Sequence, residues 1–270
     1  MLENLKNVTL HCTISNEEYW IWFVLQVLQD LPTKIIICDT GSDDLTFEIL
    51  KFCKFKNIEY RRMGKIKSNE HVLLRNELIK DTKTDWFAIV DGDEIWSKVL
   101  WQEINYYLNK VDTDIIVVPN ISPFPRLGYI GHGDKDFSIA GVKGEHYAKI
   151  FRIKNDLKWS DDFSSSFLSY SDGTIVSGGN LPTMRVMSSP MTHLTMLPRS
   201  SNDLITIGRN NKLQIGQQKS TNDFLKIDSL NLLPEILFSQ RPDIVKNPFL
   251  HENYEYKGLA PIPFPFLEHL

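Results

Sequence analysis

Short apolar segments alternate with segments of helical periodicity over the first 120 residues. Residues 34–38 (KIIIC) and 86–90 (WFAIV) are apolar at nearly every position, which is typical of strands buried on both faces of a parallel sheet. Between them, residues 44–55 place apolar side chains at the spacing of one helix face. The expected strands are residues 7–14, 34–38, 57–62, 86–90 and 114–119, and the further expected helices are residues 69–80 and 97–109.

This alternation predicts an α/β fold, with a doubly wound, mostly parallel sheet and helices on both faces. Residues 15–18 (SNEE) supply an N-cap and acidic first turn for an apolar helix that ends near residue 30. Ligands of such sheets bind at the carboxyl ends of the strands. Ser15, Asp39 and Asp91 each follow the end of an expected strand, so we expect them to meet at one edge of the sheet.

The pattern changes after Pro119 and divides the chain into three regions. Residues 1–120 form the Rossmann-like half, residues 121–199 form a second half that opens with a long loop over residues 121–146, and residues 200–270 form an extension. The loop is rich in Gly and Pro, and long loops in compact domains are often functional. In the remainder, residues 146–153 and 174–178 are expected to be strands, and residues 200–238 mainly helical.

Composition limits the partners and the compartment. The 270-residue chain has a net charge of −4 and no block of Lys or Arg, which argues against nucleic-acid binding. The three cysteines form no C-x-x-C pair and lie in apolar contexts, so we expect buried thiols in a reducing, cytoplasmic compartment. No signal peptide or transmembrane helix is expected. The apolar tail GLAPIPFPFLEHL is expected to pack on the body of the protein, on a second copy or on a membrane surface.

An acidic turn, Asp91-Gly92-Asp93-Glu94, follows the apolar strand at residues 86–90. Carboxylates this close repel one another and cannot be buried unpaired. A divalent cation such as Mn²⁺ or Mg²⁺ prefers carboxylate oxygens and leaves positions open for phosphates. Gly92 permits close approach of a ligand to the backbone. A solvated turn is the alternative for an isolated D-x-D, but its position at the end of a buried strand favours a cation site.

Four motifs together resemble family 2 glycosyltransferases of the GT-A fold. They are CTISNEE (12–18), KIIICDTGSDDLTFEIL (34–50), LLRNELI (73–79) and WFAIVDGDE (86–94), in the order and spacing of that family. The resemblance covers residues 1–120 well and is weaker from residue 121 onward. It implies a UDP- or GDP-sugar donor, a Mn²⁺ or Mg²⁺ ion and inversion at the anomeric carbon. The second half would then face the acceptor, which is a glycan, a lipid-linked molecule or a protein.

The resemblance also implies roles for individual residues. The donor-binding residues would be Thr13, Ser15, Glu17, Asp39, Thr40, Arg75, Asp91 and Gly92. The metal ligands would be Asp91, Asp93 and His193, with Thr192 and Thr195 placed to orient the imidazole. Thr40 stands where the family has a second acid, which leaves the choice of base open. Glu17 as a helix-dipole acid, Arg75 as a solvated residue and His193 as a core or surface histidine are the structural alternatives.

An inverting transfer needs a general base that takes the proton of the acceptor hydroxyl. The segment KWSDDFSSS (158–166) offers Asp161 and Asp162, and neighbouring residues point in different directions, so we expect only one to face the site. The family has Glu-Asp here, and a helix N-cap is the structural alternative.

Three other functions compete with this interpretation. One is a GT-A-like module that binds a sugar nucleotide or a partner without turnover. Another is a phosphatase of the haloacid dehalogenase type, but its D-x-D comes near the chain start, whereas two strand–helix units come first here. A sugar nucleotidyltransferase would need a Gly-rich phosphate loop after the first strand, and HCTISNEE is not one.

Overall fold

The computed structural model describes residues 2–123, 129–131, 138–154, 156–161, 166–177, 181–201, 224–226 and 233–246. Its helices are α1 (Ile21–Leu28), α2 (Thr46–Phe52), α3 (Ser68–Asp81) and α4 (Lys98–Tyr107), with 3-10 helices at Glu3–Asn7, Leu194–Met196 and Glu235–Phe238. Its main strands are β1 (Val8–Ile14), β2 (Lys34–Asp39), β3 (Ile58–Arg62), β4 (Trp86–Ile89), β5 (Glu94–Trp96), β6 (Ile115–Ile121), β10 (His146–Arg152), β13 (Met184–Val186) and β14 (Met191–His193). Smaller pairs are β7 (Tyr129–Gly131) with β15 (Phe224–Lys226), β8 (Ser138–Ile139) with β9 (Val142–Lys143), and β11 (Lys158–Asp161) with β12 (Ser166–Ser169).

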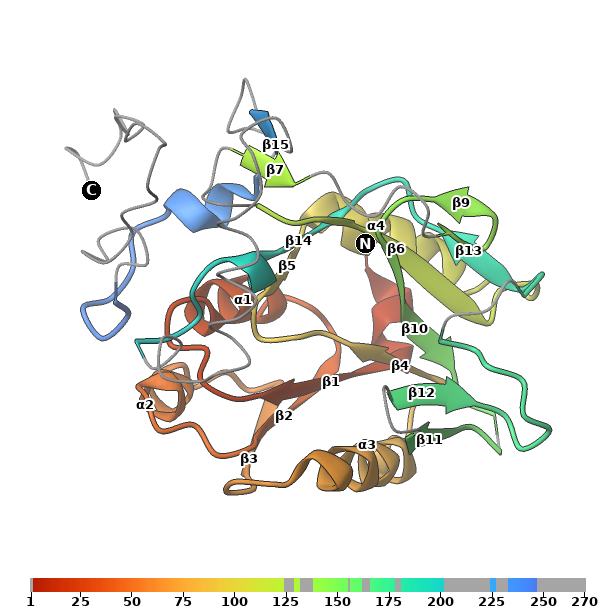
Figure 1. Ribbon diagram of the computed structural model, residues 1–270, viewed down its shortest axis with the longest axis horizontal. Helices are drawn as coiled ribbons and strands as arrows, with labels where there is room; N and C mark the ends of the chain where they lie inside the picture. Colours follow the sequence, from red (N-terminus) through yellow and green to blue (C-terminus); the bar gives the residue numbers. More distant parts are fainter. Residues whose placement is uncertain are drawn as a thin grey trace.

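One sheet dominates the described part of the chain, in the order β3-β2-β1-β4-β10-β6-β14-β5, with β13 paired to β6 (Figure 1). Strands β3, β2, β1 and β4 are parallel neighbours. β10 is antiparallel to both β4 and β6 and separates them. The mostly parallel α/β sheet expected from the sequence is therefore confirmed, with one antiparallel strand inserted at its centre.

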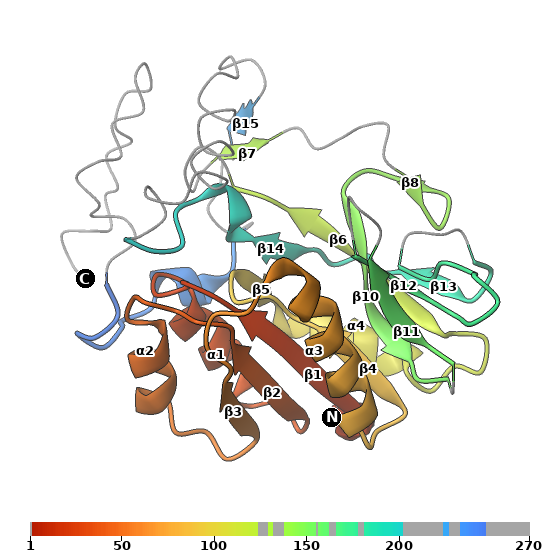
Figure 2. The ribbon, with the colours of Figure 1, turned by 60° about the horizontal axis from the view of Figure 1, so that its bottom comes forward.

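Both faces of the sheet are covered, which explains the apolar runs. On β2, Ile35 and Ile37 join the large core that includes α1, α2 and α4, whereas Ile36 and Cys38 face α3 on the other side (Figure 2). Successive strand residues point to opposite faces of the sheet. A strand that is buried on both faces is therefore apolar at nearly every position. The three cysteines are buried and unpaired, as expected.

Some boundaries and elements differ from the sequence prediction. The first helix begins at Ile21, with Trp20 as its N-cap residue, so the expected N-cap at residues 15–18 is wrong. Glu17 and Glu18 instead form ion pairs with distant residues. The predicted strand at 174–178 is wrong for its described residues, 174–177, where Ile175 makes a single bridge to Ser169.

The extension also departs from the helical prediction wherever it is described. Residues 224–226 form strand β15, and residues 235–238 form one 3-10 turn. Most of residues 200–238, much of the 121–146 loop and the apolar tail lie outside the described residues. Leu233, Leu237 and Val245 pack into the main core beside α1. No helix in the described ranges is long and apolar enough to cross a membrane.

Glu18 fixes this extension to the loop after β1. Its buried carboxylate accepts hydrogen bonds from the backbone N–H of Ser201 at 2.8 Å and from the ammonium of Lys246 at 3.1 Å. These contacts join residues separated by 183 and 228 positions in the chain. The end of the described chain is thereby held against the edge of the sheet that carries the site.

His11 on β1 gives the fold a measurable pH dependence. Its ring is buried, stacks on Phe87 at 5.0 Å and lies 2.8 Å from the hydroxyl of Thr82. Burial, reinforced by the charge of Arg61, lowers the pKa of His11 to about 3. The unfolded chain therefore binds this proton more readily than the folded one. The neutral His11 ring therefore contributes fully to the free energy of unfolding above the ordinary histidine pKa. This contribution is lost as the pH falls toward 3, by about 1.4 kcal/mol per pH unit at most.

We expect the free energy of unfolding of His11→Gln to depend less on pH in this range than that of the wild type. The amide can still reach Thr82 but does not titrate. Urea unfolding at pH 7 and pH 4.5 measures the effect, with His146→Gln as the matched control outside the core. Equal losses of unfolding free energy in the wild type and in His11→Gln would contradict the assignment.

Candidate active site

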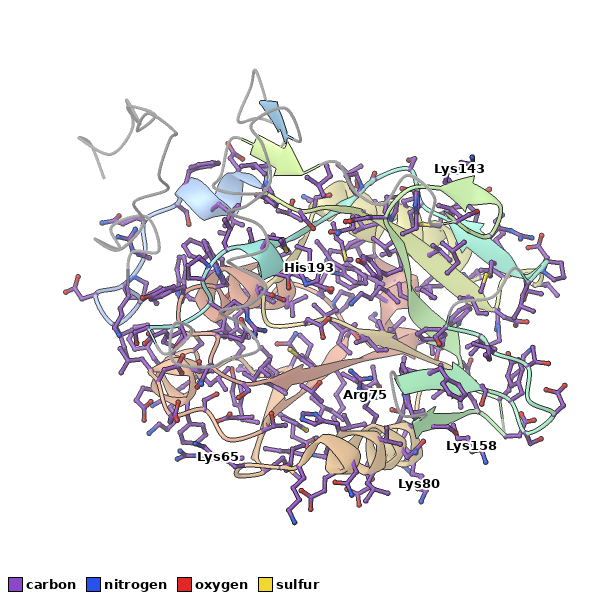
Figure 3. All side chains as sticks on the ribbon, viewed as in Figure 1. Lys65, Arg75, Lys80, Lys143, Lys158 and His193 are labelled. Atoms are coloured by element: carbon purple, nitrogen blue, oxygen red, sulfur yellow. The ribbon has the colours of Figure 1, made fainter. Side chains whose placement is uncertain are left out.

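A cavity of about 360 Å³ opens at the carboxyl ends of β1 and β4. Its lining residues are Thr13, Ile14, Ser15, Glu17, Thr40, His71, Arg75, Asp91, Gly92, Asp93, His193, Thr195 and Arg199. In Figure 3, Arg75 comes from the α3 side and His193 from the β14 side. The lining includes most of the donor-binding and metal residues implied by the resemblance, which come together because parallel strands end at the same edge.

The turn between β4 and β5 carries the acidic cluster, which is paired with cations on two sides. Lys149 on β10 places its ammonium 3.0 Å from Asp91 Oδ2 and 2.5 Å from Glu94 Oε1. On the other side, Nε2 of His193 lies 3.3 Å from Asp93 Oδ1, and the guanidinium of Arg199 lies 4.0 Å from Asp93 Oδ2. The turn is therefore an ion network with buried Asp93 and Glu94 and a half-buried Asp91, and the solvated-turn alternative is wrong.

These pairs determine the charges in the cluster. Burial opposes ionisation of Asp91, but the charge of Lys149 outweighs it and lowers the pKa of Asp91. Burial likewise opposes ionisation of Asp93, and the hydrogen bond and charge of His193 lower its pKa. Burial raises the pKa of Glu94 to about 6, so this carboxyl is ionised at neutral pH. Burial disfavours the imidazolium of His193, but its hydrogen bond to Asp93 raises its pKa.

Glu17 connects the first strand end to this cluster. Its buried carboxylate accepts a hydrogen bond from Arg199 at 2.6 Å, and its backbone N–H donates to the hydroxyl of Thr46 at 2.7 Å. Arg199 thus lies between Glu17 and Asp93. Glu17 is an ion-paired residue of the cavity wall, and the helix-dipole alternative is wrong because α1 begins four residues later.

Asp39 lies beneath the cavity rather than in its lining. It is fully buried, and its Oδ1 accepts hydrogen bonds from the N–H groups of Gly41 at 3.2 Å and Ser42 at 2.8 Å. Thr40, the next residue, lines the cavity and donates its hydroxyl to the carbonyl of Ile14 at 2.9 Å. Asp39 therefore shapes the turn that presents Thr40, and direct contact of Asp39 with a ligand stays a prediction.

The loops after β1 and β2 are joined to each other. Asn16 adopts a positive φ of 56°, which short polar residues tolerate best. Its N–H donates to the hydroxyl of Ser42 at 2.9 Å, and its side-chain oxygen accepts from the N–H of Asp43 at 3.0 Å. Hydrogen bonds between backbone and side chains consequently hold the two loops in place beside the cavity.

Arg75 extends from α3 over the ring of Trp159, with 4.8 Å between the guanidinium carbon and the ring centroid. The neighbouring Asn76 binds the backbone of Trp159 through two hydrogen bonds, of 2.9 Å and 2.8 Å. Arg75 is thus a half-buried residue of the cavity and not the solvated residue of the alternative reading.

One of the two candidate bases, Asp161, lies at the end of the same strand as Trp159. Asp161 is the last residue of β11, and its backbone pairs with that of Ser166. Because Asp161 lies in a strand, the helix N-cap alternative is wrong for this residue. The side chain of Asp161 and the whole of Asp162 lie outside the described residues, so their catalytic role stays a prediction.

Gly92 has no room for a side chain. A Cβ atom at this position would lie 2.8 Å from Cγ of Glu17 and 2.9 Å from Cγ2 of Ile14. We expect Gly92→Ala to displace Glu17 and the acidic turn, to cost about 1–3 kcal/mol of unfolding free energy, and to weaken the binding of nucleoside diphosphates. Urea unfolding and titration calorimetry measure the two effects. Wild-type affinity in the alanine variant would contradict the tight packing of this turn.

The donor set of the cluster fits a divalent cation. One ligand atom from each of Asp91, Glu94 and His193 lies within 4.8 Å of the others. Among the described residues of the cluster, Oδ2 of Asp93, Oε1 of Glu94 and Nδ1 of His193 are buried without a hydrogen-bond partner. Carboxylate oxygens with one imidazole nitrogen suit Mn²⁺ well and Mg²⁺ less well. This group includes Asp91 and His193 of the predicted ligands, together with Glu94, whose Oε1 is ion-paired with Lys149. Asp93 as a metal ligand stays a prediction.

Sequence reasoning missed three cavity or cluster residues: Lys149, Arg199 and His71. A signal existed for Lys149, because HYAKIFRI places a lysine inside a strand that is otherwise apolar around it. A charged residue at a buried strand position needs a partner. Arg199 and His71 carry no such local signal. Of the two threonines beside His193, Thr195 lines the cavity and Thr192 is buried on β14.

The fold and this site define the class of protein. It is an α/β protein whose parallel strand ends gather an acidic turn and several cations around one cavity. The model of Glycosyl transferase family 2 matches residues 13–170, and the chain belongs to this family. The match confirms the family resemblance of the sequence and, with the observed sheet, the GT-A fold.

Several solved structures are similar to this chain at low identity. Residues 1–349 of TarS from S. aureus are 14% identical, with a TM-score of 0.48, over 70% of this chain and 60% of that chain. The mannosyltransferase PcManGT from Pyrobaculum calidifontis, in complex with GDP-Man and Mn²⁺, is 18% identical, with a TM-score of 0.37, over 42% and 35% of the two chains. Glucosyl-3-phosphoglycerate synthase from Mycobacterium tuberculosis, in complex with Mn²⁺, uridine diphosphate and glucosyl-3-phosphoglycerate, is 16% identical, with a TM-score of 0.33, over 47% and 50%. The match spans less than two thirds of each of these chains, and no curated protein sequence matches.

Proposed function

We propose that this protein transfers a sugar from a UDP- or GDP-sugar to an acceptor hydroxyl, with a divalent cation and with inversion at the anomeric carbon. The observation that carries the proposal is the cavity of about 360 Å³ at the strand ends, where Asp91 and Asp93 lie beside the cations Arg75 and Arg199. Membership of Glycosyl transferase family 2 supports the reaction class.

Different residues of the cavity are proposed to bind the nucleoside, the diphosphate and the cation. Thr13, Ser15 and Thr40 line the cavity where the β1 and β2 loops meet, which suits the nucleoside. Arg75 and Arg199 offer guanidinium groups to the diphosphate, since guanidinium binds phosphate oxygens through paired hydrogen bonds. A cation held by Asp91, Asp93 and His193 would add positive charge beside the diphosphate leaving group.

The transfer itself needs one bond formed and one broken. The acceptor oxygen bonds to the anomeric carbon, and the bond from that carbon to the diphosphate oxygen breaks. Asp161 or Asp162 takes the hydroxyl proton, and the nucleoside diphosphate leaves with the electron pair. Because neighbouring residues point in different directions, only one of the two acids is expected to face the acceptor.

A donor-hydrolysis and transfer assay tests the proposal against its rivals. The full chain is incubated with UDP- and GDP-sugars and Mn²⁺, and release of the nucleoside diphosphate is followed with and without candidate glycan, lipid-linked and protein acceptors. We expect release that requires the cation. Binding without any turnover would favour the non-catalytic module, and cleavage of simple phosphomonoesters would favour the phosphatase.

His193 is expected to set the preference for the cation. Removing its imidazole in His193→Ala takes away a nitrogen ligand that Mn²⁺ accepts more readily than Mg²⁺. We therefore expect weaker Mn²⁺-dependent donor binding and a narrower preference for Mn²⁺ over Mg²⁺, measured by calorimetry with each ion. His146→Ala serves as the control. An unchanged preference in His193→Ala would remove His193 from the ligand set.

A further inference from the structure

Lys149 is a buried cation inside the carboxylate cluster. Its side chain is 9% exposed, and its neighbours on β10, Ala148 and Ile150, are buried apolar residues. The register between β10 and β6 shifts between Ala148 and Ile150, so Lys149 is the extra residue of a β-bulge. Bulges redirect side chains and occur often beside active sites. Here the bulge directs the lysine toward the acidic turn.

The ammonium of Lys149 occupies the inner side of that turn. It lies between Oδ2 of Asp91 and Oε1 of Glu94. The other oxygen of Glu94 accepts from the N–H of Asp91 and from the indole of Trp96, both at 3.2 Å. While Lys149 stays in place, its ammonium therefore competes with a metal for Oε1 of Glu94 and for Oδ2 of Asp91. Only the outer side, with Asp93 and His193, remains accessible from the cavity.

The charges around the turn support this division. Four carboxylates lie together among the described residues: Glu17, Asp91, Asp93 and Glu94. Two cations are paired with them, Lys149 and Arg199. Without Lys149, the cluster would be more negative by one charge, and the inner side would offer its own oxygen ligands.

We propose that Lys149 is a positioning residue for the divalent cation: it fills the inner side of the carboxylate cluster and confines the cation to Asp93, His193 and the outer oxygen of Asp91. The resting cluster then binds the free ion weakly, and the ion is held firmly only with the donor diphosphate. This inference rests on the proposed function, since the cation is the one that the diphosphate would share.

Titration of the full chain with MnCl₂ in the absence of nucleotide tests the inference separately from transfer activity. Lys149→Met removes the charge and keeps the side-chain length. It should bind Mn²⁺ about tenfold more tightly than the wild type, because a repelling charge a few ångströms away is gone. Mn²⁺ should also raise its midpoint of thermal unfolding more than that of the wild type. Lys149→Arg, which keeps the charge, and Lys154→Met, which removes another ion-paired lysine near the end of β10, should resemble the wild type.

Lys149→Met leaves the buried Glu94 unpaired and can fail to fold for that reason. Lys149→Met with Glu94→Gln removes both partners and frees Oδ2 of Asp91, so it should still bind Mn²⁺ at least about threefold more tightly. Unchanged or weaker Mn²⁺ affinity in the folded variants would overturn the proposal. The proposal would also be overturned if the wild-type protein bound UDP or GDP with equal affinity in EDTA and in Mn²⁺. Lys149 would then take the place of the divalent cation. If the variants show the expected order of Mn²⁺ affinities but the protein transfers no sugar, the proposed function alone would be contradicted.

Discussion

Asp93→Asn is expected to lower the rate of Mn²⁺-dependent donor turnover by roughly 10²–10³-fold, on the scale of removing one charge-stabilising group from an active site. Asparagine keeps the shape of the side chain but removes the negative charge that faces the cavity. The Asp93 carboxylate is 2% exposed and is held between His193 and Arg199. Loss of its charge therefore removes the carboxylate partner of His193 and the more distant of the two carboxylates beside Arg199, and it weakens the hold on the metal.

The fold should survive this change. Asp91 and Glu94 lie in the same buried turn, so removing one of three like charges relieves repulsion. We expect the midpoint of thermal unfolding in EDTA to stay near that of the wild type while Mn²⁺ no longer raises it. Asp85→Asn, at the opposite end of β4 and exposed, is the matched control. Full turnover by Asp93→Asn would exclude Asp93 as the main metal ligand.

Removal of the general base is expected to have a similarly large effect on the chemical step. One of Asp161→Asn and Asp162→Asn should lower turnover by about 10²–10⁴-fold, the usual range for general-base catalysis, while the other stays near the wild type. Donor binding should be nearly normal in both, because the base acts on the acceptor. Steady-state rates and donor affinities, measured side by side, separate the two effects.

Asp156→Asn, in the turn before β11, controls for the loss of an acid in this region, where Asp156 accepts hydrogen bonds from Ser171. Near-full transfer by both single variants at Asp161 and Asp162 would place the base elsewhere. Equal large losses in both would point to a structural effect instead.

The sequence was sufficient to predict the strand-end half of the site. Apolar runs such as KIIIC and WFAIV identify doubly buried strands, and polar residues that follow such strands must lie at one edge. This reasoning brings Ser15, Asp39 and Asp91 together. In the structure Ser15 and Asp91 line one cavity, whereas Asp39 is buried in the turn that presents Thr40 to it. Local pattern and sheet geometry carry the same information here, so no knowledge of distant contacts was needed.

The ion pairs of the site could not be predicted in this way. Glu17 and Glu18 have the local pattern of a helix start, but their partners Arg199 and Lys246 are 182 and 228 residues away. Lys149 reaches Asp91 only because β10 is inserted antiparallel between β4 and β6. Strand insertion of this kind depends on the tertiary fold, and no short-range periodicity records it.

The central claim is that a nucleoside diphosphate sugar binds these strand ends through a divalent cation. A thermal-unfolding screen of UDP- and GDP-sugars, each in Mn²⁺ and in EDTA, tests it most directly. We predict that at least one sugar nucleotide stabilises the protein in Mn²⁺, by about 2.7 kcal/mol at one hundred times its dissociation constant, and far less in EDTA. Equal stabilisation in Mn²⁺ and EDTA, or none by any sugar nucleotide, would contradict the claim.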